Sequence, residues 1–518
     1  GELPGDKLKN KTGSAFINAH KAFIAIDDRG MKNWEDYARK FLTHKNPYTN
    51  MTWGEDPALF AICPVNENNL IATWKEDKDI KDLYQEHFAA WCKKRNVSNP
   101  TGQKYNIMFS EFIMQLYRKS FESYKKFIRG LGVKALLTDA NNSRGMEICM
   151  ELDSCDYLDC HYYWDHPRFP GADWKLPMCY ENQSILNRPE KIMPRMYWRR
   201  YGKPFMLTEF NYCFPNAYRA EGGALMGAYS AMQDIDGIFR YAYAHHDSYI
   251  TGNTPAKLFD VVSDPVSQFS ERLAILLFLR GDASPGLQEY CFDIKKEMSV
   301  YATGKDETVR FPEGLANAAM VSKVSNISSG DIPSGTIKWT SDWYRHLSMG
   351  KFKLNPVFAA SDNGQIILDC ENLTFKVVTP KTEIFVLSNP GTLHGKVATA
   401  NLSKGHTVIG ISAMDNNSLK NSKKILVLHI TDILNTGMKF KGNNTVLTDW
   451  GKLPLLIQKG DADIILKTSL KNVTIWALDN GGNRIGQVPF KLNNGALEFT
   501  ARTINKKIAT MAYEITGR

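Results

Sequence analysis

Two glutamates follow apolar runs of the kind that form buried parallel strands. The run Leu59–Val65 leads directly into Asn66 and Glu67, and the run Pro204–Thr208 leads into Glu209. The carboxyl ends of parallel strands are where α/β enzymes assemble their sites. Two carboxyl groups that face each other at about 5–5.5 Å can cleave a glycosidic bond, since one protonates the leaving oxygen while the other attacks the sugar carbon. Either glutamate alone is typical of a solvated loop, but the pair predicts a glycosidase.

Polar and aromatic side chains also fall at the ends of the neighbouring expected strands, which span 133–138, 157–162 and 237–245. Alternation along a strand places His161 and Tyr163 on one face. The alternative is that one of these rings only packs against the sheet. The candidates for substrate contact at these strand ends are Asn141, His161, Tyr163, Tyr243 and His245.

Aromatic residues concentrate after the strand over 157–162, where they are Tyr162, Tyr163, Trp164, Phe169, Trp174 and Tyr180. Sugars present flat C–H faces that stack on such rings, so a loop with several exposed aromatics suits a saccharide cleft. Trp164 and Trp174 are therefore candidate platforms for a sugar. The alternative is a small satellite core beneath a long loop.

A metal-dependent hydrolase is the competing chemistry at the same strand ends. Its ligands would come from His161, His166, His245, His246 and Asp247. Metal-dependent barrel hydrolases also draw ligands from their first strand, often as H-x-H, and no H-x-H occurs here. C-x-x-C pairs are absent as well, and neither nucleotide-binding glycine motifs nor a G-x-S-x-G elbow stand between a strand and a helix. We therefore expect neither a metal nor an organic cofactor.

The ordered set of motifs resembles the clan A glycoside hydrolases, and in particular family 5-like bacterial enzymes. In that clan Asn-Glu ends the fourth barrel strand and Glu ends the seventh, which matches Asn66-Glu67 and Thr208-Glu209. The segments 44–68, 277–282 and 447–460 are similar to other parts of these proteins.

The resemblance implies roles for individual residues. Glu67 would be the general acid/base, Glu209 the nucleophile, and Asn66 the residue that holds the sugar 2-hydroxyl. Tyr163 or His161 would contact the nucleophile. The clan usually has an arginine near the end of strand 2, and no residue of this sequence can be assigned to that position.

Composition and charge set the broad class. The chain has 518 residues, of which 43% are hydrophobic and 23% charged, so it should bury large cores in two or three domains. Its net charge of +9 comes from scattered basic residues, which argues against a nucleic-acid partner. No apolar run approaches the roughly 18 residues that a membrane span needs.

The order of elements predicts a (β/α)8 TIM-type barrel over 1–283, followed by β-sandwich domains over 284–445 and 446–518. Five strands are visible in the barrel, and the resemblance implies that they are strands 4 to 8. The 57 residues before Ala58 hold one clear helix and a candidate strand at Ala15–Ile26. Strands 1 to 3 should therefore come from outside this chain, for example from a second polypeptide segment.

The C-terminal half, from about Ser284, should contain no helix longer than about three turns. Within it, the polar stretch Phe311–Gly335 is expected to be a loop-rich insertion. The complete chain is predicted to be a retaining β-glycoside hydrolase of poly- or oligosaccharides. A non-catalytic carbohydrate-binding protein on a degenerate barrel is the alternative. Secretion or a periplasmic location follows from this function alone, since no signal peptide is present in the sequence.

Overall fold

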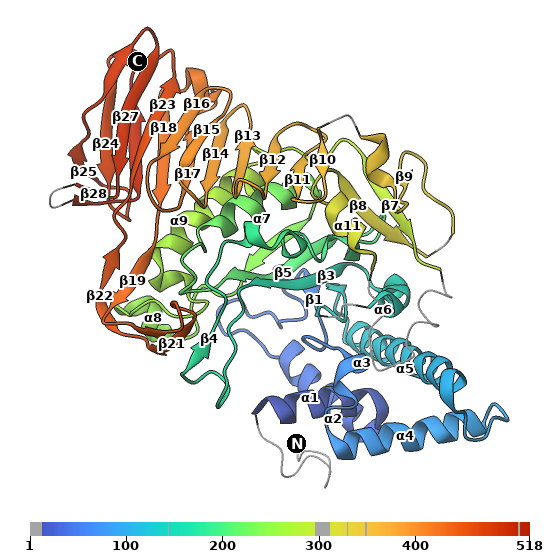
Figure 1. Ribbon diagram of the computed structural model, residues 1–518. Coiled ribbons are helices and arrows are strands. Elements are labelled where there is room, and N and C mark those ends of the chain that lie inside the picture. Colours follow the sequence, from blue (N-terminus) through green and yellow to red (C-terminus); the bar gives the residue numbers. More distant parts are fainter. Residues whose placement is uncertain (1–12, 143–144, 296–310, 329, 348–349, 506–507) are drawn as a thin grey trace.

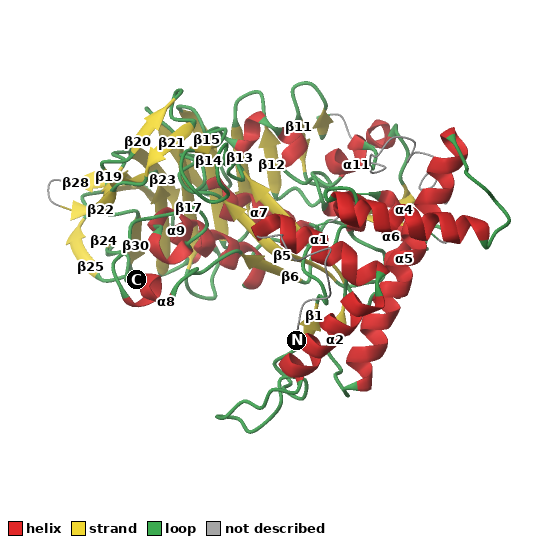
Figure 2. Ribbon diagram, turned by 90° about the horizontal axis from the view of Figure 1, so that it is seen from below, coloured by secondary structure: helices red, strands yellow, loops and turns green. Residues whose placement is uncertain are grey.

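The computed structural model describes residues 13–142, 145–295, 311–328, 330–347, 350–505 and 508–518. A group of helices lies at one end of the molecule, antiparallel sheets lie at the other, and short parallel strands lie between them (Figure 1). The same order is seen from below in Figure 2. Within these ranges no helix is both long and apolar enough to cross a membrane.

The first helical group consists of α1 (Gly13–Ile26), α2 (Asp28–Leu42), α3 (Leu70–Thr73), α4 (Lys78–Lys93) and α5 (Gly102–Gly130). The prediction of a strand at Ala15–Ile26 is wrong, because the run belongs to α1. Its buried side chains are Ala19, Ala22, Phe23, Ile24, Ala25 and Ile26. Four of them follow the i, i+3, i+4 and i+7 spacing of a helical stripe, and the last turn is buried on its other sides as well. Consequently the described residues from 13 to 51 form α1 and α2 and contribute no strand to the sheets.

The five predicted parallel strands are present as β1 (Ala61–Ile62), β2 (Leu136–Leu137), β3 (Leu158–Trp164), β5 (Phe205–Tyr212) and β6 (Gly237–Arg240). β1 pairs in parallel with β2, and β5 pairs in parallel with both β3 and β6. Backbone hydrogen bonds from Asp156 to Leu137 and from His161 to Asn141 connect the two groups. All five carboxyl ends therefore point the same way. Between β3 and β5 the chain forms short 3-10 turns, among them Pro189–Lys191 and Met196–Trp198.

Two helices cover the parallel strands on the side of the sandwich. α7 (Glu221–Met232) is buried on all sides, and α9 (Pro265–Ala274) continues as the π-helical turn Ile275–Leu279. Gly223 makes their close approach possible, since a Cβ there would lie 1.7 Å from the carbonyl oxygen of Ser270. The short helices α6 (Met146–Glu151) and α8 (Asp247–Thr251) complete this part.

The sequence predicts antiparallel sheet directly after Ser284, but a small parallel sheet comes first. β7 (Glu289–Asp293) pairs in parallel with β8 (Lys323–Ile327) and β9 (Ile337–Lys338). α11 (Glu313–Ala318) and β8 both fall in the stretch predicted as a loop, because its alanine and valine residues are buried despite the polar composition. α11 has six residues, so in the described part of the C-terminal half no helix exceeds three turns.

The C-terminal sandwich consists of two antiparallel sheets. The larger has ten strands: β10 (Phe352–Lys353), β11 (Phe358–Ala360), β12 (Ile366–Asp369), β13 (Thr374–Val378), β14 (Thr382–Leu387), β17 (Thr407–Ala413), β18 (Lys424–Ile430), β30 (Ala512–Thr516), β24 (Thr474–Leu478) and β25 (Arg484–Gln487). The smaller has five: β15 (Gly391–His394), β16 (Ala398–Leu402), β23 (Asp461–Lys467), β27 (Ala496–Arg502) and β26 (Lys491–Asn493). The boundary drawn at 445/446 thus falls within one sheet, because β18 pairs with β30 across it.

Both faces of the larger sheet are buried at its central strands β14 and β17. In β14, Ile384 and Val386 belong to the core shared with α7 and α9, whereas Phe385 and Leu387 belong to the core between the two sheets. Period-two alternation sends successive side chains to these two cores.

Small hairpins tie the sandwich to the central strands. β19 (Ile433–Thr436) pairs with β22 (Lys452–Ile457), and β21 (Val446–Asp449) pairs with both β20 (Lys439–Lys441) and β4 (Met178–Cys179). β28 (Ile504–Asn505) and β29 (Ile508–Ala509) form a further short hairpin. The loop after β3 is therefore held in place by the C-terminal half.

A buried charge cluster joins the same two parts of the molecule. The Arg219 side chain is 0% exposed and donates to both carboxylate oxygens of Asp264 at 2.7 and 2.9 Å. It also donates to Asp432 at 2.5 Å, next to β19. Asp264 caps α9 as well, because it accepts a hydrogen bond from the backbone N–H of Val266.

Candidate active site

Glu67 lies in a strained turn five residues beyond β1. Its φ is +54°, a left-handed conformation that a glutamate rarely adopts. The turn is held from below, because the Glu67 backbone N–H donates to Asn141 Oδ1 at 2.8 Å and Asn68 Nδ2 donates to the Asp139 carboxylate at 3.0 Å. Such support fixes the direction of the Glu67 side chain.

Glu209 lies within β5, beside His161 of β3. The two residues are register partners in the parallel pair, and the register shifts just before them. A bulge of this kind re-aims a side chain at a sheet edge or site. The Glu209 side chain is 20% exposed and the Glu67 side chain 34%, so both remain accessible to a ligand.

The ring of His161 bridges the two glutamates. Its Nδ1 lies 2.9 Å from Glu67 Oε1 and 3.3 Å from Glu209 Oε2, and its side chain is only 3% exposed. The three ligand atoms all lie within 4.8 Å of one another. The carboxylates predicted from two distant strand ends therefore meet in one site.

Each carboxylate has one further hydrogen-bond donor. Tyr163 donates its hydroxyl to Glu209 Oε2 at 2.5 Å, and Asn142 Nδ2 donates to Glu67 Oε1 at 3.1 Å. His161 and Tyr163 thus lie on the same face of β3, as alternation predicts. Tyr162 points the other way and donates to the Lys191 carbonyl.

A buried aspartate ties the strands together beneath the site. Asp159 accepts hydrogen bonds from Thr208 Oγ1 at 2.7 Å, from Thr138 Oγ1 at 3.1 Å and from Asn141 Nδ2 at 3.4 Å. These partners come from β5 and from the end of β2. Because a buried polar network is stable only when its members are satisfied, this one fixes the spacing of the strands that carry the site.

Electrostatics favour the charged form of Glu67. The hydrogen bond from His161 lowers the Glu67 pKa, and the charges of His161, Lys21 and His166 act in the same direction, while burial opposes them. Burial and the Glu209 carboxylate raise the pKa of Tyr163 far above its ordinary value, so this tyrosine remains a donor. Beneath the site, burial raises the pKa of Asp139 to about 7.

Aromatic rings line one side of the glutamates. Tyr241 and Phe259 pack against Tyr163, with ring centroids 6.2 and 5.2 Å away. His166 and Trp174 continue this row, and Trp174 is 55% exposed. The rings therefore extend from the carboxylates to solvent.

Trp164 takes no part in this row. It is 3% exposed and donates from Nε1 to the Gln183 carbonyl at 3.2 Å. The expectation of a sugar platform at Trp164 is corrected, because alternation along β3 places this ring on the buried face with Tyr162. Tyr180 is buried in a satellite core with Met178 and Leu447.

The remaining predicted residues differ in their exposure and in their hydrogen-bond partners. Asn66 is exposed, and its Oδ1 accepts from Asn141 Nδ2 at 3.4 Å. Asn141 is buried and supports Glu67 from beneath the site. His245 is paired with Asp260 at 2.8 Å and touches the ring of Tyr241. Tyr243 is 62% exposed.

Glu67, His161 and Glu209 are also the group that could hold a metal ion, since each offers one ligand atom in the same small space. Of the other ligands considered from the sequence, His245 is occupied by Asp260, and the His166 Nδ1 lies 2.9 Å from the Pro167 carbonyl. Tyr163 and Asn142 donate to the two carboxylates of this trio.

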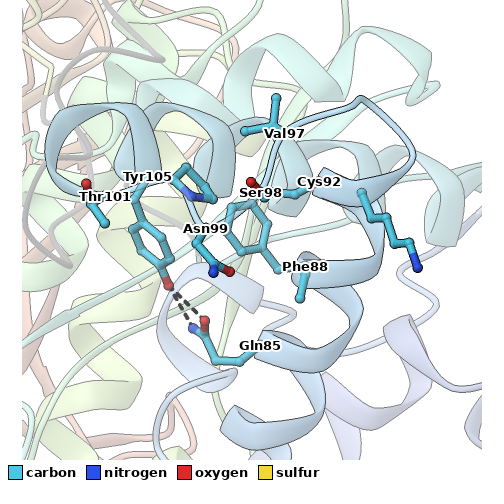
Figure 3. Close-up of a pocket in the computed structure, with 11 residues that line it drawn as sticks. Gln85, Phe88, Cys92, Val97, Ser98, Asn99, Thr101 and Tyr105 are labelled. Carbon is cyan, nitrogen blue, oxygen red and sulfur yellow. Dashed lines mark hydrogen bonds between the residues drawn. The ribbon is translucent and has the colours of Figure 1, made fainter.

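A cavity of about 530 Å³ lies elsewhere, between α4 and the start of α5 (Figure 3). Phe88 and Cys92 line it, and Tyr105 exchanges hydrogen bonds with Gln85 at 2.8 and 3.0 Å. None of its lining residues belongs to the glutamate site.

Sequence reasoning missed three residues around the glutamates: Asn142, Tyr241 and Lys21. Asn142 adjoins the predicted Asn141, so its place at the strand end was a usable signal. Tyr241 lies within the strand predicted over 237–245, where alternation could not decide between Tyr241 and Tyr243. Lys21 comes from α1, which the sequence did not place near the site.

Comparison with known proteins gives distant structural relatives only. No protein-family profile and no curated protein matches the chain. Among solved structures, an endo-1,4-beta-D-mannanase from Thermotoga petrophila RKU-1 is 11% identical, with 49% of this chain and 67% of that chain covered and a TM-score of 0.30. A glycoside hydrolase family 5 mannosidase from Rhizomucor miehei is 13% identical, with 49% and 61% covered and a TM-score of 0.26.

An alpha-L-fucosidase isoenzyme 2 from Paenibacillus thiaminolyticus is 8% identical, with 96% of this chain and 81% of that chain covered and a TM-score of 0.31. The structures that match the chain thus include glycoside hydrolases, one of them from family 5, which the sequence resembles. All three TM-scores lie below 0.5, so the functional argument rests on the geometry of the site.

Proposed function

We propose that this chain is a retaining β-glycoside hydrolase of poly- or oligosaccharides. The observation that supports it most is the meeting of Glu67 and Glu209, of which one carboxylate oxygen each lies within 4.8 Å of the other. Such proximity supports a retaining pair, whose carboxyl groups lie roughly 5–5.5 Å apart, over an inverting pair, whose groups lie roughly 6.5–9.5 Å apart.

In the proposed reaction Glu209 attacks the anomeric carbon and Glu67 protonates the leaving oxygen. The glycosyl–enzyme ester is then hydrolysed by a water that Glu67 deprotonates. Tyr163 would orient Glu209 and stabilise its charge, and Asn66 would meet the sugar beside Glu67. Because His161 holds the Glu67 pKa below its ordinary value of 4.5 in the free site, kcat/KM should already decrease with rising pH in the acid range.

The proposal extends to the scaffold. β1, β2, β3, β5 and β6 would be strands 4 to 8 of a (β/α)8 barrel, with residues 1–283 as the catalytic unit. Trp174 would stack on a sugar, and Tyr243 and His245 would lie further along the cleft. Secretion or a periplasmic location would suit an enzyme that acts on polysaccharides.

The test is a pair of variants assayed on a panel of aryl β-glycosides and polysaccharides. Glu209→Ala should lose activity on every substrate, because no ester can form. Glu67→Ala should be severe for ordinary sugar leaving groups and mild in the first step for a dinitrophenyl glycoside, which needs no proton. Azide should then restore turnover of that substrate and yield a β-glycosyl azide. Glu86→Ala, on the exposed side of α4, is the matched control.

Three outcomes would contradict this assignment. Azide rescue of Glu209→Ala with an inverted product, together with an unrescued Glu67→Ala, would exchange the two roles. Unchanged activity in both variants would refute the assignment of these two residues. If the wild-type protein has no activity on the panel and still binds polysaccharide, the chain is a carbohydrate-binding protein and not a hydrolase.

A further inference from the structure

The turn over 63–69, between β1 and α3, carries Glu67 and is held by side chains from other elements. The Glu67 φ of +54° is a conformation that persists only where the surrounding structure enforces it. The Glu67 N–H donates to Asn141 Oδ1, and Asn68 Nδ2 donates to the Asp139 carboxylate. Both of these partners follow β2. The conformation of the turn therefore depends on contacts from outside its own sequence.

The hydroxyl of Tyr117, on α5, closes the same turn. It donates to the Asn68 carbonyl at 2.7 Å and accepts from the Leu70 N–H at 3.1 Å. Asn68 is next to Glu67, and Leu70 is the first residue of α3, which contacts α5 (Figure 1). One hydroxyl thus fixes the path of the backbone from Glu67 into the helix.

Water cannot take the place of this hydroxyl, because Asn68, Leu70 and Tyr117 are all buried. Without the hydroxyl, one buried carbonyl and one buried N–H would lose their partner. Such unpaired groups are costly, so the turn would take a different backbone path in which they find other partners.

Tyr117 is itself fixed by the packing of α5. Ile113, Phe121 and Tyr124 lie at i−4, i+4 and i+7 from it, and they are buried on the same side of the helix. The hydroxyl therefore stays in place while the turn is fitted to it.

A second aromatic side chain holds the turn before Glu67. Trp34, on α2, donates from Nε1 to the Pro64 carbonyl at 3.0 Å. Its ring packs on Tyr124 of α5, with centroids 4.5 Å apart. The helices thus hold the turn at Pro64 and at Asn68, on either side of Glu67.

The direction of the Glu67 side chain follows from this backbone. Its Oε1 lies 3.1 Å from Asn142 Nδ2 and 2.9 Å from His161 Nδ1. A misplacement of about 1 Å can cost a catalytic group about 100-fold in rate. A change in the turn would therefore reach the carboxyl group even though Tyr117 does not touch it.

We propose that Tyr117 is a positioning residue for Glu67, and that its hydroxyl holds the turn in the conformation that aims the Glu67 carboxyl group at the leaving oxygen. It acts through the backbone of Asn68 and Leu70. The catalytic part of this inference rests on the proposed function.

The kinetic test compares Tyr117→Phe with Tyr84→Phe on a series of aryl β-glycosides whose leaving groups differ in basicity. Tyr84 is the matched control, because its buried hydroxyl donates to a backbone carbonyl elsewhere, that of Ala22 at 2.8 Å. In Tyr117→Phe, kcat/KM should fall by about 10- to 100-fold for basic leaving groups, which need a proton from Glu67. For a dinitrophenyl glycoside, which needs none, it should fall by at most about twofold.

This pattern separates positioning from stability. Both variants lose a buried hydrogen bond, so both should have a lower melting temperature. A smaller folded fraction lowers kcat/KM by the same factor on every substrate, whereas a displaced proton donor makes the loss grow with leaving-group basicity. p-Aminophenylalanine in place of Tyr117 keeps a donor for the Asn68 carbonyl and should restore most of the loss.

A second measurement works without turnover. Amide hydrogen exchange, resolved to single residues by mass spectrometry, reports on the Glu67 N–H, whose acceptor Asn141 is unchanged in the variant. Its exchange should become at least about tenfold faster in Tyr117→Phe and stay as in the wild type in Tyr84→Phe. A wild-type protein without activity on any glycoside would refute the proposed function, and this exchange would still decide whether Tyr117 holds the turn.

Two results would overturn the role of Tyr117. One is a kcat/KM that is unchanged, or lowered equally, across the whole series of leaving groups in Tyr117→Phe. The other is an unchanged exchange rate of the Glu67 amide in that variant, which would show that the turn keeps its conformation without the hydroxyl.

Discussion

Glu209 in β5 and Glu383 in β14 are both glutamates within buried strands, yet their surroundings differ in kind. The Glu383 carboxylate accepts from three backbone N–H groups, those of Lys396, Val397 and Ala398, at 2.8 to 2.9 Å. Glu209 is held instead by the side chains of Tyr163 and His161. Backbone donors are permanent and fill the carboxylate, whereas side-chain donors leave it able to react.

The same difference separates the two halves of the molecule. In the sandwich β14 and β17 are buried along their whole length, and their polar groups are bonded internally. In the parallel strands the side chains at the carboxyl ends are polar and partly accessible. The comparison suggests that the sandwich and its contacts supply stability, while the strand ends supply chemistry. Variants in the sandwich and its contacts should then lower the free energy of unfolding, whereas variants at the strand ends should lower activity.

The largest expected effect falls on the charge cluster between the halves. Arg219→Leu leaves Asp264 and Asp432 buried without their cation, so the free energy of unfolding should fall by about 3–5 kcal/mol. Urea denaturation followed by circular dichroism measures this loss. Lys32→Met, which removes an exposed ion pair, should change stability little. Similar stability of the two variants would contradict a central role for the cluster.

The second test contrasts the two faces of β3. Tyr163→Phe removes the donor to Glu209 and should lower kcat by about 10²- to 10³-fold, with the free energy of unfolding nearly unchanged. Tyr162→Phe removes a buried hydrogen bond to the Lys191 carbonyl and should cost about 1 kcal/mol of stability while sparing kcat. Steady-state kinetics and denaturation of both variants check the contrast, which fails if Tyr162→Phe is the less active protein.

A third test concerns pH and the sandwich core. Burial lowers the pKa of His429 to about 4 from its ordinary 6.5, and neither ring nitrogen has a well-formed hydrogen bond. The unfolded chain therefore takes up a proton first, and the free energy of unfolding should decrease as pH falls from about 6.5 to about 4, by at most about 3 kcal/mol. His429→Leu should lack this component. Parallel stability curves for the two proteins would refute it.

The smallest effect is expected at the aromatic rim. Trp174→Ala should raise KM by about two- to tenfold, as expected for the loss of one stacking ring, and leave the melting temperature unchanged. Trp164→Phe should lower the melting temperature without affecting KM, since this ring is buried. A KM effect from Trp164→Phe would restore it as a sugar platform.

Periodicity and strand-end position explain what the sequence could predict. The apolar runs before Glu67 and Glu209 marked two parallel strands, and alternation selected His161 and Tyr163 over Tyr162. The same alternation places Trp164 on the face of Tyr162 and therefore argues for its burial. A glutamate beside an apolar run does not by itself indicate a site. The glutamate of β14 comes before its apolar run, and its carboxylate is bonded to backbone N–H groups.

The misses have physical causes as well. Ala15–Ile26 reads as a strand by hydrophobicity alone, but its buried positions follow a helical period. α4 was not predicted, although its buried residues Ile80, Leu83, Tyr84 and Phe88 follow the spacing of an amphipathic helix. Tyr117 could not be linked to the Glu67 turn from the sequence, since only the packing of α5 beside α3 brings its hydroxyl there.

The sharing of β14 between two cores has a consequence for how the protein comes apart. Opening the space between α7 and the larger sheet exposes Ile384 and Val386, and opening the sandwich exposes Phe385 and Leu387 on the same strand. Neither event can proceed without loosening the ladder that serves the other. Heat should therefore melt both regions in a single calorimetric peak, and the amides of β14 should be among the last to exchange with deuterium.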